Sequence, residues 1–202
     1  MMNKIKFLLL FILAVPHAIL YLLSNNKKTI EYEVSRWSNI MSTPYRKMGG
    51  VIRLMYLVCT TPEFRNLFYL RLGPINVVLR YLPRESTLHI TTDSRKIEPG
   101  LFIQHGFATV VTADHIGRDC WINQCVTIGW NDSKTKGLGK PCIGDNVRVS
   151  AGAKVCGPIN VGSNSTIGVN AVVVKNVPSN SVIIPSPMMI LYQNNERVNK
   201  IL

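Results

Sequence analysis

The sequence predicts a mainly β protein, namely a left-handed parallel β-helix of six-residue repeats preceded by an α-helical N-terminal region. Two observations carry this prediction. From residue 97 onward an aliphatic residue opens nearly every block of six. A period of six fits neither the 3.6-residue period of a helix nor the two-residue period of a strand. Before residue 85, apolar residues recur at helical spacing between prolines.

Length and composition set the class of protein. The 202 residues leave room for one compact domain with an appendage. With 47% apolar and 17% charged residues, the chain does not have the composition of a disordered protein. Five cysteines, without a CxxC spacing, are interpreted as reduced and mostly buried. No metal site is expected.

The net charge of +12 is concentrated in the first part of the chain. Residues 1–84 hold 12 Lys and Arg against three Glu, a net charge of +9. Nucleic acid or an anionic membrane surface would each explain this excess. The apolar N-terminus favours the membrane. We therefore expect no nucleic-acid partner, and a cytoplasmic protein associated with the inner face of the membrane.

Residues 1–29 form the first segment, which is apolar and membrane-leaning. The run Phe7–Leu23 carries no charge and has lysines on both sides. Its length lies at the lower edge of what spans a bilayer, and Pro16 and His17 would be costly in hydrocarbon. An interfacial or membrane-anchoring helix is the first expectation. A buried helix and a true span or signal peptide stay open as alternatives.

Residues 30–84 form the second segment, which we expect to be helical. Aromatic residues and leucines recur at helical spacing, and prolines mark the helix boundaries. A helical pack with a solvated basic face is a simpler interpretation of this segment than a catalytic role. The expected helices are Ile30–Met41, Val51–Thr60, Glu63–Leu72 and Ile75–Leu82.

Residues 85–190 are expected to form the β-helix, and residues 191–202 a C-terminal tail. Each unit of six supplies a short strand and a tight turn, and three units close a triangular coil of roughly 18 residues. The opening aliphatic residue points into the prism and stacks on its counterparts in the neighbouring coils. These residues are Ile97, Ile103, Ile116, Ile122, Ile128, Ile143, Val149, Val155, Val161, Ile167 and Val173.

Two interruptions of the period are informative. Ile103 and Ile116 are 13 residues apart instead of 12, so one residue is added. Ile128 and Ile143 are 15 apart, so nine residues are inserted. We expect the insertion to protrude as a loop over residues 130–142. Loops that leave a rigid solenoid commonly carry recognition residues.

The stretch Ile97–Pro178 resembles the serine acetyltransferase group of hexapeptide acyltransferases. The upstream helix PEFRNLFYLRLG (62–73) resembles the leader of polysaccharide-biosynthesis members of that group. The resemblance implies an acyltransferase that takes acetyl-CoA as co-substrate, needs no metal and assembles as a homotrimer. It rests on IEPGLFIQHGFATVV (97–111), IGRDCWINQCVTIG (116–129), KPCIGDNVRVSAGAKVCG (140–157) and IGVNAVVVKNVP (167–178).

The resemblance places His105 on the family's catalytic histidine. The family motif reads aspartate-His-x-x-Gly-hydrophobic-Val, and residues 104–111 correspond to it here. A hydroxyl group is a poor nucleophile until a base takes its proton, and a neutral imidazole suits that task near pH 7. His17, His89 and His115 are more easily explained as surface or structural residues.

Departures from the family pattern bear on the acceptor. Gln104 replaces the acid before the histidine, and Asp93 is the acid nearest to the second acidic position, which aligns near Ile90. Lys140 replaces the second histidine of serine-binding members. We name Gln104, Asp93 and Lys140 as acceptor-binding residues and expect a sugar hydroxyl of capsular or surface polysaccharide biosynthesis as acceptor. The candidates for orienting His105 are Asp93, Glu98, Asp114 and a backbone carbonyl.

Two other functions stay open. One is serine O-acetylation in cysteine biosynthesis, and the other is a non-catalytic β-helix scaffold. On the donor side, the resemblance implies that coenzyme A lies in a groove between subunits and is held by backbone groups, with lysines on its phosphates. The corresponding positions are Gly129, Trp130, Ala151, Gly152, Lys154, Val169 and Lys175.

Overall fold

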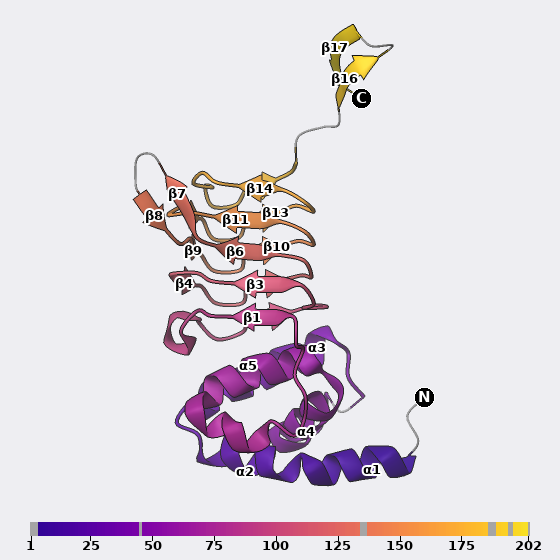
Figure 1. Ribbon diagram of the computed structural model, residues 1–202. Coiled ribbons are helices and arrows are strands. Elements are labelled where there is room, and N and C mark those ends of the chain that lie inside the picture. Colours follow the sequence, from indigo (N-terminus) through magenta and orange to yellow (C-terminus); the bar gives the residue numbers. More distant parts are fainter. Residues whose placement is uncertain (1–3, 45, 134–136, 186–188, 194–195, 202) are drawn as a thin grey trace.

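The computed structural model describes residues 4–44, 46–133, 137–185, 189–193 and 196–201. A layer of helices lies at one end of the molecule, and a stack of short parallel strands rises from it (Figure 1). The expected order of a helical region followed by a parallel β-helix is confirmed. The left-handed sense of the coil stays a prediction.

The N-terminal third is helical, as expected. The apolar run expected as one helix is divided into two α-helices, and three further α-helices correspond to the next three predicted ones. The last predicted helix is a 3₁₀ helix that starts earlier, at Gly73. Gly73 has a φ of +66° and ends the preceding α-helix. Among the described residues, no helix combines the length and apolar character needed to cross a membrane. The helices are α1 (Lys4–Leu13), α2 (Val15–Leu23), α3 (Lys27–Ile40), α4 (Gly50–Thr60), α5 (Pro62–Leu72) and η1 (Gly73–Leu79).

An aromatic cluster joins the helices to the first coil. The buried Trp37 ring on α3 packs edge-on against Phe64 of α5 and Phe102 of the coil, with ring centroids 5.3 and 4.6 Å apart. Its indole N–H donates to the carbonyl of Leu101 at 2.8 Å. The helical layer and the coil therefore share one hydrophobic core.

The coil has three parallel sheets, one for each side of the prism. One sheet contains β1 (Leu88–Ile90), β3 (Thr109–Val111), β6 (Thr127–Gly129), β11 (Lys154–Cys156) and β14 (Val172–Val173). The second contains β2 (Phe102–Ile103), β5 (Trp121–Ile122), β10 (Arg148–Val149), β13 (Thr166–Ile167) and β15 (Val182–Ile183). The third contains β4 (His115–Ile116), β9 (Cys142–Ile143) and β12 (Asn160–Val161). The short 3₁₀ helix η2 (Ser94–Lys96) precedes β2.

The repeat explains both the core and the corners. All eleven block-opening aliphatic residues are buried. Strand pairing stacks Ile103 on Ile122, Ile122 on Val149, and Val149 on Ile167. The fourth residue of a block commonly has a left-handed backbone, which Asn, Asp and Gly tolerate best. Examples are Asp119, Asn146, Asn164, Asn170 and Gly152.

The nine-residue insertion leaves the coil as an antiparallel hairpin, β7 (Asn131–Ser133) and β8 (Gly137–Gly139) (Figure 1). Residues 134–136 of the expected loop lie outside the described part of the chain. A second hairpin, β16 (Met189–Gln193) and β17 (Glu196–Ile201), follows the last coil. The boundary expected at residue 190 therefore falls within β16, and the residues expected to form a tail include β17.

Candidate active site

His105 lies on the corner between β2 and β3, where Ile103 and Val111 are eight residues apart, whereas their partners Ile122 and Ile128 in the next coil are six apart. His105 and Ala108 have φ values of +53° and +50°, so this corner contains two left-handed residues. The corner between β5 and β6 has one such residue, Cys125. A left-handed non-glycine residue is strained, and such strain is concentrated at functional sites. The Phe107 amide donates to the His105 carbonyl at 2.8 Å, which closes the turn.

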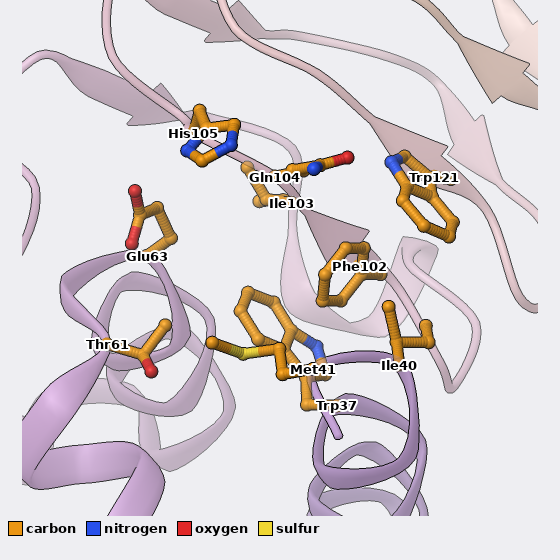
Figure 2. Close-up of a pocket in the computed structure, with 10 residues that line it drawn as sticks. All are labelled: Trp37, Ile40, Met41, Thr61, Glu63, Phe102, Ile103, Gln104, His105 and Trp121. Atoms are coloured by element: carbon orange, nitrogen blue, oxygen red, sulfur yellow. The ribbon is translucent and has the colours of Figure 1, made fainter. Parts of the chain in front are cut away.

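A pocket of about 250 Å³ opens beside this corner, between the coil and the helices. Figure 2 shows His105 and Gln104 on its coil side and Glu63 on its helical side. The remaining lining is mostly apolar and aromatic, and no Lys or Arg is among the lining residues. The lining is completed by Trp37, Ile40, Met41, Thr61, Phe102, Ile103 and Trp121.

Glu63 is a site residue that our reasoning from the sequence missed. It lies in the first turn of α5, and its carboxylate points toward the His105 ring (Figure 2). Carboxylates are favoured at this end of a helix. A Cβ atom at Gly106 would lie only 3.1 Å from Glu63 Cγ, so the glycine permits the close approach. One signal was available, because Glu63 is one of only three acids in the basic residues 1–84.

The three expected acceptor residues lie in different places. Gln104 lines the pocket with His105, and its Oε1 accepts from Asn123 Nδ2 at 3.2 Å. Asp93 is exposed and lines a separate hollow. Its carboxylate is bound by the side chain and backbone N–H of Arg95, which lower the pKa of Asp93 to about 2. The structure thus brings Gln104, but not Asp93, to His105.

Lys140 lies at the base of the protruding hairpin. Its Nζ lies 3.3 Å from the Asp114 carboxylate and 5.0 Å from the centre of the Trp130 ring. Asp114, one of the residues considered for orienting His105, is therefore paired with Lys140. Glu98 lines the hollow that contains Asp93. None of the three acids considered lines the pocket that contains His105, and Glu63 is the acid that does.

Several expected donor-binding residues share a column of corners with His105. The Cys125 amide donates to the Phe107 carbonyl at 3.0 Å, which links the corner of His105 to the next one. Gly152 N–H then donates to Gln124, and Asn170 N–H to Ala151, at 3.0 and 2.9 Å. Ala151, Gly152 and the exposed Val169 thus lie on corners stacked above His105.

The other expected donor residues lie on or beyond the neighbouring strands. Lys154 on β11 donates from Nζ to the Cys125 carbonyl at 2.6 Å, so it lies against the same column. Gly129 ends β6, exposed Trp130 follows it, and Lys175 is exposed after β14. These three lie where the strands of one sheet end, beside the hairpin. The column and this edge are the surfaces available to a long donor.

Metal ligands and thiols do not gather at the site. Among the described residues, no group of three or more His, Cys, Asp or Glu could hold a metal ion. All five cysteines are free thiols. Burial raises the pKa of Cys120 to about 12, which makes it a poor nucleophile. The groups in the pocket that can move a proton are His105 and Glu63.

Known proteins with similar sequences are serine acetyltransferases. Serine acetyltransferase of Staphylococcus aureus is 44% identical over 106 residues, which cover 52% of this chain and 49% of that protein. The Staphylococcus xylosus enzyme is 41% identical over 112 residues, with coverage of 52% and 51%. The chain thus spans about half the length of the curated relatives it matches. No family model matches the chain.

Solved serine acetyltransferases share the fold. The Entamoeba histolytica enzyme in complex with L-cysteine aligns with a TM-score of 0.59 and 23% identity, over 89% of this chain and 67% of that one. The Neisseria gonorrhoeae enzyme in complex with serine aligns with a TM-score of 0.54 and 23% identity, over 80% of this chain and 67% of that one. Together, the matches support a serine acetyltransferase-like hexapeptide-repeat acyltransferase family. These sequence relatives are named serine acetyltransferases, and none of those compared is a member of the polysaccharide branch that the leader helix predicted.

Proposed function

We propose that this chain transfers an acetyl group from acetyl-CoA to a hydroxyl group, with His105 as general base. One observation carries the proposal. The strained corner of His105 lies beside a pocket that also contains a carboxylate, on a β-helix similar in sequence and fold to serine acetyltransferases. A pocket with a convergent acid and base is the expected form of such a site.

In the proposed reaction, the neutral His105 imidazole takes the proton of the acceptor hydroxyl as its oxygen attacks the thioester carbon. The C–S bond then breaks, and the thiolate of coenzyme A takes the proton from the imidazolium. Glu63 stabilises the imidazolium and holds the ring in orientation, as a carboxylate does beside a catalytic histidine. Backbone N–H groups stabilise the oxyanion. No covalent enzyme intermediate forms.

L-Serine is the acceptor that the comparisons favour over a sugar. The sequence relatives are named serine acetyltransferases, and one structural neighbour is a complex with serine. Within the pocket, Glu63 is available for the ammonium group of serine. The lining residues include no cation for the carboxylate. We expect Lys140 of a neighbouring copy to supply that charge, in a homotrimer with its sites between subunits.

A sugar hydroxyl stays the second candidate because of the pocket lining. Gln104 is neutral, and the Trp121 and Phe102 rings, which pack edge to face with centroids 4.7 Å apart, give the lining an aromatic character that suits a sugar better than a small zwitterion. The buried Trp121 Nε1 atom has no hydrogen-bond partner among the described residues, and a hydroxyl bound in the pocket would supply one. A sugar would need no cation in the pocket.

The deciding experiment measures thiol release from acetyl-CoA with L-serine and with a panel of glycosides, and identifies each product by mass. Saturable formation of O-acetylserine, with a KM that rises in Lys140→Ala, supports serine. Acetylation of a glycoside at least about tenfold more efficient than that of serine supports the sugar. Inertness toward every hydroxyl acceptor would overturn the proposed activity and favour the scaffold.

A further inference from the structure

The helical end of the molecule exposes a continuous apolar face, which we call the apolar base. Helices α1 and α2 lie along this end, on the far side of the helical layer from the coil (Figure 1). Leu23 and Val78 are 76% and 60% exposed, although both are apolar. Large exposed apolar patches mark interaction sites. The base contains Leu9, Ile12, Leu13, Val15, Ile19, Leu22 and Leu23 of the two helices, Ile75, Val77 and Val78 of η1, and Tyr81.

The polar residues of α2 face inward, which leaves the outer face of this helix apolar. His17 is fully buried, and its Nε2 atom lies 2.9 Å from the Tyr69 hydroxyl. Desolvation lowers the pKa of His17 to about 4, so this ring is neutral near pH 7. Ala14, Ala18 and Tyr21 are buried on the same side. The residue that argued against a hydrocarbon environment is thus kept away from the exposed face.

Helix η1 extends the same face. The Tyr81 hydroxyl donates to the Leu13 carbonyl at 2.8 Å, which fixes the end of η1 against the junction of α1 and α2. At the other end of the face, Leu23 and Ile75 line one shallow hollow. The base is therefore built from two separate segments that are held together, and not from one frayed helix.

Basic residues border the base. Lys27, Lys28, Arg80 and Arg84 are exposed, and Lys27 Nζ lies 5.9 Å from the ring of Tyr21 at the end of α2. No Asp or Glu occurs in residues 1–30 or 64–84. An apolar face that is bordered by positively charged residues is complementary to a bilayer surface with anionic headgroups. A second copy docked face to face would bring two basic borders together, which is unfavourable.

We propose that the apolar base docks on an anionic lipid bilayer, with α1 and α2 lying in the interface. The coil, the His105 pocket and the protruding hairpin then project away from the lipid into water (Figure 1). This inference does not depend on the acetyl acceptor. It places the enzyme on the membrane whichever hydroxyl it modifies.

The test is co-sedimentation of the full chain with vesicles of phosphatidylcholine alone or with phosphatidylserine, at low and high salt. We expect binding to the anionic vesicles only, weakened by salt. Ile12→Glu/Ile19→Glu should lower the bound fraction by more than about tenfold, and Lys27→Glu/Lys28→Glu should also weaken binding. Val182→Glu/Ile184→Glu, at comparably exposed apolar positions on the coil, is the matched control and should bind like wild type.

Thermal melting of each variant, with light scattering, completes the test. All six substituted positions on the helices and the coil are exposed, so melting temperatures should stay near that of wild type. Failure of the wild-type chain to bind anionic vesicles would overturn the proposal, as would equal loss of binding in the control. A particle that halves in mass in Ile12→Glu/Ile19→Glu would overturn it too, because the base would then be an interface between copies.

Discussion

Removing one partner of the buried ion pair between Arg71 and Glu33 should be one of the most destabilising single substitutions in this chain. Their side chains are 3% and 1% exposed, and Arg71 Nη2 lies 2.7 Å from Glu33 Oε1. The same guanidinium donates to the carbonyls of Ser94, Ile97 and Glu98 at 2.6, 2.8 and 3.1 Å. It thus ties α3 and α5 to the residues that lead into the first coil.

Arg71→Met would leave the Glu33 carboxylate buried without its partner. Burial already raises the pKa of Glu33, and loss of Arg71 would raise it further. Breaking such a pair costs about 3–5 kcal/mol of unfolding free energy. The double variant Glu33→Leu/Arg71→Met removes both charges, and it leaves the three carbonyls without this donor and the Gly100 N–H without the Glu33 carboxylate. The double variant should therefore lose only about 1–3 kcal/mol of unfolding free energy.

Urea unfolding of the two variants and wild type at pH 7 measures these differences. Arg71→Met should have a clearly lower unfolding free energy than Glu33→Leu/Arg71→Met. A loss below about 1 kcal/mol in Arg71→Met would refute the reasoning. An equal loss in both variants would refute it as well, because the unpaired charge would then cost nothing.

Three further predictions concern the site and the helical pack. Burial lowers the pKa of His17 from its usual 6.5 to about 4 in the folded chain. Above pH 6.5 the ring is neutral in both the folded and the unfolded chain, so the unfolding free energy has its full value there. Up to about 3 kcal/mol should be lost as the pH falls toward 4, and urea unfolding of His17→Gln should show a smaller decline. Glu63→Gln should lower kcat by roughly 10²-fold and change the pH–rate profile, while the melting temperature stays unchanged. An unchanged pH–rate profile would show that Glu63 does not orient His105. Gly106→Ala would place a Cβ atom 3.1 Å from Glu63 Cγ and 2.9 Å from Ile103 Cγ2. Because this displaces the two groups beside His105, kcat should fall without a matching rise in KM. Wild-type kinetics in this variant would contradict the packing.

The repeat made the coil predictable, because each buried aliphatic residue occupies the same place in a unit of six. The sequence showed that one residue is added between Ile103 and Ile116, but it did not show that His105 lies on an irregular corner within this interval. Contacts between distant segments were not predictable in the same way. Glu63 lines the pocket of His105 only because α5 packs on the coil, and Asp93 lies outside this pocket, where Arg95 binds it locally.

The acceptor is where residue matching was least informative. Gln104 and Lys140 replaced family residues, and from these we expected a sugar, whereas the known relatives are serine acetyltransferases. A departure from the family pattern shows which functional group is missing at that position, but it does not show which other residue in the folded chain takes over its role. Glu63 on the helical side of the pocket is such a group. Its position follows from tertiary packing and not from local pattern.

The most direct test of the central claim is the turnover of acetyl-CoA by His105→Ala, beside His115→Ala as a control at another exposed histidine on the coil. Product is quantified by mass with the acceptor that wild type uses best, and melting temperatures are compared. The account predicts a kcat lower by about 10² to 10⁴ in His105→Ala with unchanged melting, and near-wild-type turnover in the control. Turnover within about threefold of wild type in His105→Ala would contradict the claim that His105 is the base.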